Sequence, residues 1–110
     1  MDVRVVLVTA PGGEVARTIA RTLVEERLAA CVNRVPGISS TYRWQGGIVE
    51  DTEDLLILKT TKDRLDVLMA RVREIHPYTV PEVLALEVAE GSASYLDWVT
   101  EETRPSPEIP

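Results

Sequence analysis

The sequence predicts an α+β fold made of two β-α-β halves, and two observations carry this prediction. Strand-like and helical apolar patterns follow one another in the order β-α-β-β-α-β-α. A glycine-containing turn near the middle of the chain separates two strand-like arms, so a long central hairpin joins the halves. This order is typical of a ferredoxin-like split β-α-β sandwich, in which the helices pack on one face of an antiparallel sheet. The last helix is an extra C-terminal element.

Length and composition indicate one folded domain. The 110 residues are 45% hydrophobic and 27% charged, as in ordinary globular domains and unlike disordered chains. We expect a single domain over residues 1–103, and a proline-rich flexible tail over residues 104–110 that cannot hold a helix or strand. The net charge of -6 repels phosphate backbones, so we expect no nucleic-acid partner.

The first half of the chain contains a strand, a helix and a bent strand. Val3, Val5, Val6, Leu7 and Val8 put apolar side chains on both faces, which is typical of a central strand, and a Pro-Gly-Gly breaker at 11–13 ends it. Apolar residues at helical spacing predict a helix over 14–27. A second strand starts near residue 29, and we expect Pro36-Gly37 to bend this strand without ending it.

The central hairpin is predicted over residues 41–53, with its turn at Gln45-Gly46-Gly47. Strand alternation puts Tyr42 and Trp44 on one face of this hairpin. Because an isolated two-stranded ribbon is marginally stable in water, we expect another copy of the chain to cover these rings. The alternative is that both rings pack on their own domain.

The second half repeats the pattern. Residues 55–58 form an apolar strand, Thr61 is a candidate N-cap, and the helix that follows ends before Pro77. Residues 83–88 predict the last strand, and a short helix follows with apolar residues at 95, 96, 98 and 99.

Two residues are candidates for metal or nucleophile chemistry. Cys31 is the only cysteine, so no intrachain disulfide forms, and its small apolar neighbours favour a packing role over a ligand or nucleophile. His76 is the only histidine, and its place at a helix end suits a cap as well as a ligand. Neither residue belongs to an HxxxH or CxxC motif, so a metal site would need ligands from more than one subunit.

The remaining polar features of the sequence do not indicate a specific functional site. The acidic stretch 50–54 lacks the glycine and spacing of a calcium loop and is interpreted as a solvated face. Lys59, at the end of an apolar strand, either reaches solvent or faces an anion in a cleft. No phosphate-binding loop and no Ser-His-Asp order is evident, so we expect no enzyme.

The chain shows no sign of a membrane association or of secretion. No apolar run exceeds five residues, far below the roughly 18 needed to cross a bilayer. The first residues lack the basic and long apolar regions of a signal peptide. We therefore expect a cytoplasmic protein.

Several stretches together resemble one known family, the CutA divalent-cation tolerance proteins. The resemblance covers about residues 3–103 and rests on VLVTAP at 6–11, LAACVN at 28–33, YRWQG at 42–46, LKTT at 58–61, HPYTVPE at 76–82 and YLDW at 95–98. It implies a cytoplasmic homotrimer, similar to the PII signalling proteins, with a ferredoxin-like subunit whose long hairpin packs against its neighbours.

The resemblance also implies a role in tolerance of divalent metals, copper above all, through binding or signalling to a downstream protein partner and not through catalysis. Family members proposed to bind copper carry a cysteine in the first strand and two histidines before the proline. This sequence has Val8 and Ile75 there, so only His76 carries over as a metal ligand, with Cys31 as a second candidate. Copper or another divalent cation is the expected cofactor, and folding is expected to need none.

The resemblance further implies a ligand cleft between subunits. The matching residues are aromatic or polar, as small-ligand pockets require: Asn33, Tyr42, Trp44, Glu50, Lys59, His76, Tyr78 and Glu82. The alternatives to a metal-responsive module are a small-molecule sensor, a purely structural trimer scaffold and, less favoured, an enzyme that uses Cys31 and His76.

Overall fold

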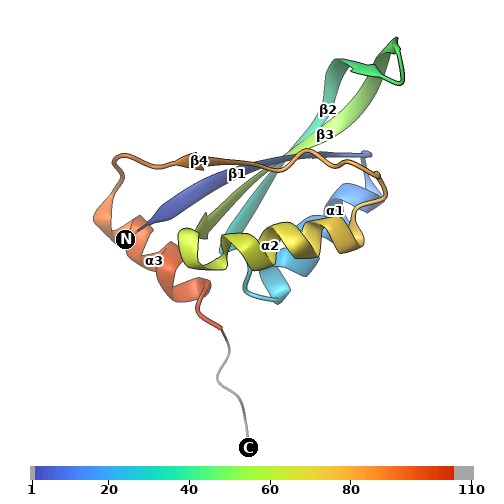
Figure 1. Cartoon of the computed structure of the whole chain (residues 1–110). Helices are drawn as coiled ribbons and strands as arrows, with labels where there is room; N and C mark the ends of the chain where they lie inside the picture. The colour runs from blue at the N-terminus through green and yellow to red at the C-terminus, as the bar shows by residue number, and fades with distance from the viewer. Residues whose placement is uncertain (1, 106–110) are drawn as a thin grey trace, which may run out of the picture.

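The structure, a computed structural model, describes residues 2–105. Its elements confirm the predicted α+β class: a four-stranded antiparallel sheet with three helices (Figure 1). They follow in the order β1 (Val3–Ala10), α1 (Glu14–Glu25), β2 (Cys31–Trp44), β3 (Gly47–Thr61), α2 (Lys62–Ile75), β4 (Leu84–Glu87) and α3 (Ala93–Glu102). Residues 106–110 of the predicted tail lie outside the described residues.

One face of the sheet forms the core. The strands lie in the order β2-β3-β1-β4, and alternate side chains such as Val6 and Val8 point toward α1 and α2, where they are fully buried. Leu56 and Leu58 of β3 join them because Val8 pairs with Leu56 and Val6 with Leu58. Ile19 of α1 packs in the same cluster. This core therefore joins the central strands β1 and β3 to α1 and α2.

The other face of the sheet carries a row of apolar side chains that α1 and α2 do not cover. We call the side chains of Val5, Leu7, Leu55, Ile57, Leu84 and Leu86 the open sheet face, since strand pairing puts them on the side opposite the core. The four on the inner strands are half-buried, and Leu84 and Leu86 on β4 are 56% and 50% exposed. A contiguous apolar surface of this kind is typical of interaction sites, unlike single exposed apolar residues.

The third helix covers only one end of the open sheet face. Val3 and Thr61 pair at the end where β1 begins and β3 ends, and both are buried together with Val99 of α3. The predicted apolar positions of this helix are otherwise outside the core, because Tyr95 and Trp98 are 41% and 43% exposed. The helix therefore presents an aromatic surface of its own.

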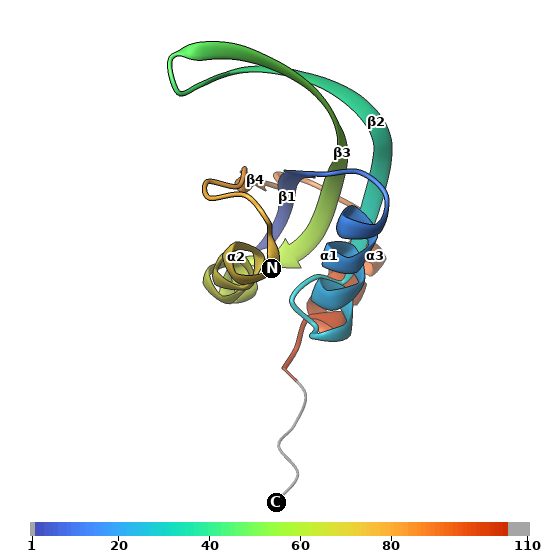
Figure 2. The same cartoon turned by 90° about the vertical axis from the view of Figure 1, so that its right-hand side faces the viewer.

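The hairpin of β2 and β3 extends beyond the body and arches over the side where β1 and β4 lie (Figure 2). The predicted bend is confirmed, because the pairing register shifts between Val35 and Ile38 while the strand continues. Gly37 has a positive φ of 71° there, which glycine adopts without strain. At the predicted turn, Gln45 and Gly46 have positive φ, whereas Gly47 already belongs to β3.

Two predicted element boundaries need correction, and one predicted N-cap lacks its hydrogen bond. The first helix ends at Glu25 and not at residue 27, because Arg27 adopts a positive φ of 59° that helices exclude. The last strand is shorter than residues 83–88, since only Leu84–Glu87 pairs with β1. Thr61 stands at the N-cap position of α2, yet its hydroxyl makes no capping hydrogen bond.

The acidic stretch 50–54 is not wholly a solvated face as predicted, because Glu53 and Asp54 are only 4% and 3% exposed. The Asp54 carboxylate accepts hydrogen bonds from Arg34 at 2.7 Å and from the backbone N–H groups of Gly13 and Gly37, each at 3.1 Å. It thus joins the start of α1 to the bend of β2. The Arg34 guanidinium, followed by the Gly37 amide, holds the pKa of Asp54 below its usual value.

Replacing Asp54 by asparagine should make the stability of the folded protein vary less with pH in the acid range. A carboxyl whose folded pKa is lowered stabilises the protein above its unfolded pKa, and this contribution is lost as pH falls through the folded pKa. We expect the substitution to lower the unfolding temperature by several degrees at neutral pH, and by much less in strong acid. Thermal unfolding across pH checks this, with Asp66→Asn on the exposed side of α2 as control. An equal loss at every pH would contradict it.

Among residues 2–105, no helix is both long enough and apolar enough to span a membrane.

Candidate functional site

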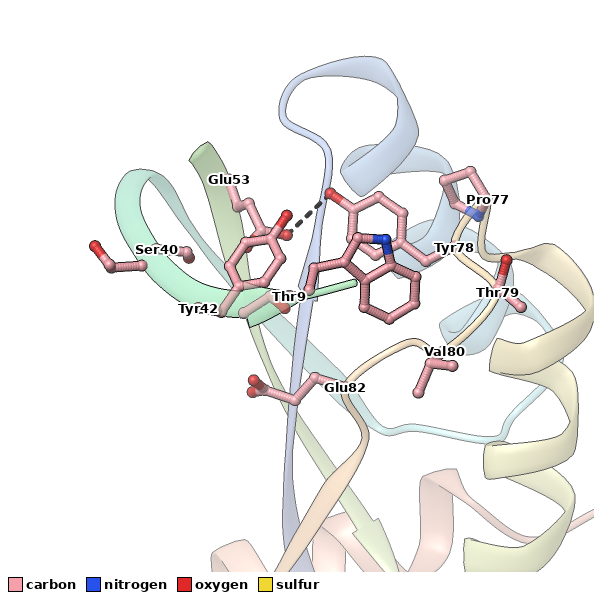
Figure 3. Close-up of a pocket in the computed structure, with 11 residues that line it drawn as sticks. Thr9, Ser40, Tyr42, Glu53, Pro77, Tyr78, Thr79, Val80 and Glu82 are labelled. Carbon is pink, nitrogen blue, oxygen red and sulfur yellow. Dashed lines mark hydrogen bonds between the residues drawn. The ribbon is translucent and has the colours of Figure 1, made fainter. Parts of the chain in front are cut away.

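A groove of about 640 Å³ lies under the arch of the hairpin, between its inner side and the loop that joins α2 to β4 (Figure 3). The hairpin supplies Tyr42, Trp44 and Glu53, and the loop supplies Tyr78 and further residues. The complete lining is Thr9, Ser40, Thr41, Tyr42, Trp44, Glu53, Pro77, Tyr78, Thr79, Val80 and Glu82. Its size suits a small molecule.

His76 anchors the loop side of the groove. The helix α2 ends at Ile75, before Pro77, and His76 turns its ring inward, where the residue is 6% exposed. Its Nε2 lies 2.8 Å from the Thr9 carbonyl oxygen, and its Nδ1 accepts the backbone N–H of Tyr78 at 3.1 Å. Because Nδ1 accepts, the proton of the neutral ring is on Nε2 and is donated to Thr9. His76 therefore fastens the loop to β1.

Tyr78 and Glu53 form the inner wall of the groove. The ring of Tyr78 packs against His76 with centroids 4.7 Å apart, and its hydroxyl donates to Glu53 Oε2 at 3.0 Å. Burial, together with this carboxylate, raises the pKa of Tyr78 to about 12. The phenol consequently stays neutral and keeps donating to Glu53 (Figure 3).

The hairpin contributes the outer wall. Tyr42 and Trp44 both line the groove, as their alternation predicts, and they are 37% and 44% exposed. The Tyr42 hydroxyl donates to Asp51 Oδ2 at 2.6 Å, and this bond is the main reason why the pKa of Tyr42 is raised. The groove thus combines aromatic rings with carboxylates, and no lysine or arginine is among its lining residues.

The structure brings together only some of the residues predicted for the cleft. Tyr42, Trp44, Tyr78 and Glu82 line the groove. Asn33 and Lys59 lie elsewhere, on the face opposite the core, where the Lys59 ammonium donates to the Asn33 side-chain oxygen.

Glu50 is exposed on the hairpin, in register with Thr41. In a single chain the residues predicted for one cleft therefore lie at separate places on the surface.

The two predicted metal ligands do not meet in one chain. Cys31 pairs with Lys59, whereas His76 contacts Thr9, whose partner on β3 is Leu55. Lys59 and Leu55 are four residues apart on β3, which corresponds to about 13 Å along a strand.

Cys31 is half-buried, and its Sγ lies 3.9 Å from Asn33 Oδ1. Burial, followed by the neighbouring Cys31, raises the pKa of Tyr95. The surroundings of Cys31 are thus more polar than the apolar packing that the sequence favoured. Across residues 2–105, no group of three or more His, Cys, Asp or Glu side chains could hold a metal ion. The metal prediction remains a prediction, and it requires more than one copy of the chain.

Sequence reasoning missed Glu53 and Thr9. Glu53 was grouped with the exposed acids around it, although it pairs with Ile38 and so shares the inner side of the hairpin with Tyr42 and Trp44. That alternation was the available signal. Nothing local in the sequence marks Thr9, because its role is a carbonyl contact with a residue 67 positions away.

Comparison with known proteins gives concordant results. The family described as "CutA1 divalent ion tolerance protein" matches residues 4–102. The "Divalent-cation tolerance protein CutA" of Thermus thermophilus is 63% identical over 99 residues, 90% of this chain and 96% of that protein. "Protein CutA, chloroplastic" of Arabidopsis thaliana is 48% identical over 100 residues, and the match covers 91% of this chain and 55% of that protein.

A solved structure is also similar. The divalent cation tolerance protein (Cut A1) from Thermus thermophilus superposes with a TM-score of 0.90 at 61% identity, covering 93% of this chain and 99% of that one. The chain therefore spans nearly the whole bacterial relative, and little more than half of the plant one.

Proposed function

Because this chain belongs to the CutA1 divalent ion tolerance protein family, we propose that it serves divalent-metal tolerance, copper above all, as a homotrimeric binding or signalling module in the cytoplasm. One observation carries the binding part of this proposal. The groove under the hairpin combines three aromatic rings with a buried carboxylate, which is the composition of a small-ligand site. An unidentified protein partner would receive the signal.

The open sheet face supports the homotrimer. A monomer with this surface would leave Leu84 and Leu86 about half exposed beside four further apolar side chains. Copies of one chain usually associate with closed symmetry, and a three-fold ring lets each copy cover the next. The arching hairpin, which stands clear of its own domain, gives such a ring its contact arm (Figure 2).

The geometry also supports binding over catalysis. A nucleophile needs a base within hydrogen-bond reach, yet both ring nitrogens of His76 are engaged by the backbone and Cys31 lies at a distant register position. The phenols of Tyr42 and Tyr78 donate to carboxylates and have raised pKa values, so they are poor bases or nucleophiles at neutral pH.

Copper does not fit the residues of a single chain. His76 would have to give up its bond to Thr9 or to the Tyr78 amide, and Cys31 lies too far away to act as the second ligand. The proposal therefore assigns copper to a site that pools copies of His76 or Cys31, whose imidazole and thiolate groups suit this metal. If no such site forms, the groove favours a small-molecule sensor as the second candidate function.

A Cu(II) titration of the full chain by isothermal calorimetry tests the metal part. We expect saturable binding that His76→Gln or Cys31→Ser removes and that Glu90→Gln, an exposed control, leaves unchanged. Binding that survives both ligand substitutions would exclude these residues as the site. No heat at any Cu(II) concentration would overturn the copper proposal in favour of a small-molecule sensor or a structural scaffold.

A further inference from the structure

We propose that the groove binds a small organic cation, a primary ammonium group carried on an apolar or aromatic body. The walls supply the rings of Tyr42, Trp44 and Tyr78, and Glu53 and Glu82 supply the negative charge. This inference rests on the proposed function, because it takes the groove as the ligand site of the module and names the class of ligand.

The buried carboxylate of Glu53 is the first step of the argument. The residue is only 4% exposed, and within residues 2–105 its one hydrogen bond comes from Tyr78 and engages Oε2. A buried carboxylate is costly unless it is paired or fully hydrogen-bonded, and no lysine or arginine lines the groove. Since Glu53 lines the groove and Tyr78 engages only Oε2, a cation bound there would pair with the other carboxylate oxygen.

The aromatic walls are the second step. A cation over the face of a tyrosine or tryptophan ring is attracted by the ring electrons, and aromatic cages are used to recognise ammonium ligands. The hydroxyls of Tyr42 and Tyr78 donate to the carboxylates of Asp51 and Glu53, so both phenols stay neutral and their rings stay electron-rich. Trp44, 44% exposed at the rim, adds the largest ring.

The groove suits an organic cation better than a bare metal ion. Its lining contains two carboxylates, Glu53 and Glu82, and no cysteine or histidine, and no cluster of three ligating side chains occurs in residues 2–105. A volume of about 640 Å³ would leave a single ion mostly surrounded by water. An amine with an apolar body fills that space and contacts rings and carboxylate together.

Three probes of nearly equal shape test the ligand class with the full chain: phenethylamine, its neutral analogue phenethyl alcohol, and the anion phenylpropionate. Binding is followed by calorimetry and by the NMR signal of the Trp44 indole N–H. We expect phenethylamine to bind at least about tenfold more tightly than the other two, since only the cation gains both the ring and the carboxylate interactions.

Single substitutions test whether the groove residues are responsible for phenethylamine binding. Glu53→Gln keeps an acceptor for Tyr78 but removes the charge, so phenethylamine affinity should fall about tenfold or more while phenethyl alcohol binding is unchanged. Trp44→Leu, at an exposed position, should also weaken the amine, and Glu90→Gln, outside the groove, should not. Near-UV circular dichroism verifies that each variant is folded.

Each other outcome overturns the inference in a recognisable way. Equal binding of all three probes, or a preference for the anion, would leave the groove as a ligand site but refute the cationic class. If no probe binds and the Trp44 signal does not move, the groove is not a ligand site, and the small-molecule part of the proposed function fails with it. Copper uptake, measured separately, is unaffected by either result.

Discussion

Replacing Leu86 by lysine is expected to dissociate the proposed homotrimer. Leu86 lies on the edge strand β4, pairs with Val5, and is 50% exposed in the single chain. In the proposed trimer a neighbouring copy covers it, and an unpaired ammonium buried there would lose its hydration without gaining a partner. We expect the dissociation constant to rise at least about 100-fold, as measured by sedimentation equilibrium across protein concentrations.

Val67→Lys is the matched control for this experiment. Val67 is 52% exposed, nearly the same as Leu86, but it lies on α2, which packs on the opposite face of the sheet. Its replacement should leave the assembly unchanged. If both variants associate as the wild-type chain does, the open sheet face is not the interface; if both dissociate, the effect is not specific to that face.

Truncating Leu56 to alanine is expected to have the largest effect on the stability of the fold. Leu56 is fully buried at the centre of the sheet, where it pairs with Val8 and packs in the cluster formed with α1 and α2. Removing its outer carbons takes away buried apolar surface and leaves a cavity, which typically lowers the free energy of unfolding by about 2–5 kcal/mol.

Urea unfolding at one fixed protein concentration measures this loss, because association contributes to the apparent stability. Val67→Ala, at an exposed position, should change the free energy of unfolding by less than about 0.5 kcal/mol. A loss below about 1 kcal/mol for Leu56→Ala would show that this cluster is not the main core of the protein.

Most of the fold could be predicted because the signals are local. The apolar alternation of β1, the helical spacing of α1 and the glycine at the hairpin turn each act through neighbours in the sequence. The errors lie where a single dihedral angle or a distant partner decides. Arg27 ends α1 through a positive φ, and its guanidinium then donates to the carbonyls of Glu101 and Arg104, more than seventy residues away.

The site was harder to predict because its polar contacts are long-range. Glu53 and Asp54 look like exposed acids until the fold brings Tyr78 and Gly13 beside them, 25 and 41 residues away in the chain. Burial of a carboxylate depends on such partners and not on its sequence neighbours. Tyr42 and Trp44 were predictable because strand alternation alone puts them on one side of the hairpin.

Native mass spectrometry of the full chain, with and without Cu(II), tests the central claim most directly, because one spectrum counts both subunits and bound metal. The proposed module should appear as three copies that carry copper in a fixed ratio, and Leu86→Lys should reduce it to single copies. A wild-type chain that stays a single copy under the same conditions would contradict the account, because the open sheet face would then lack the partner that its apolar surface requires.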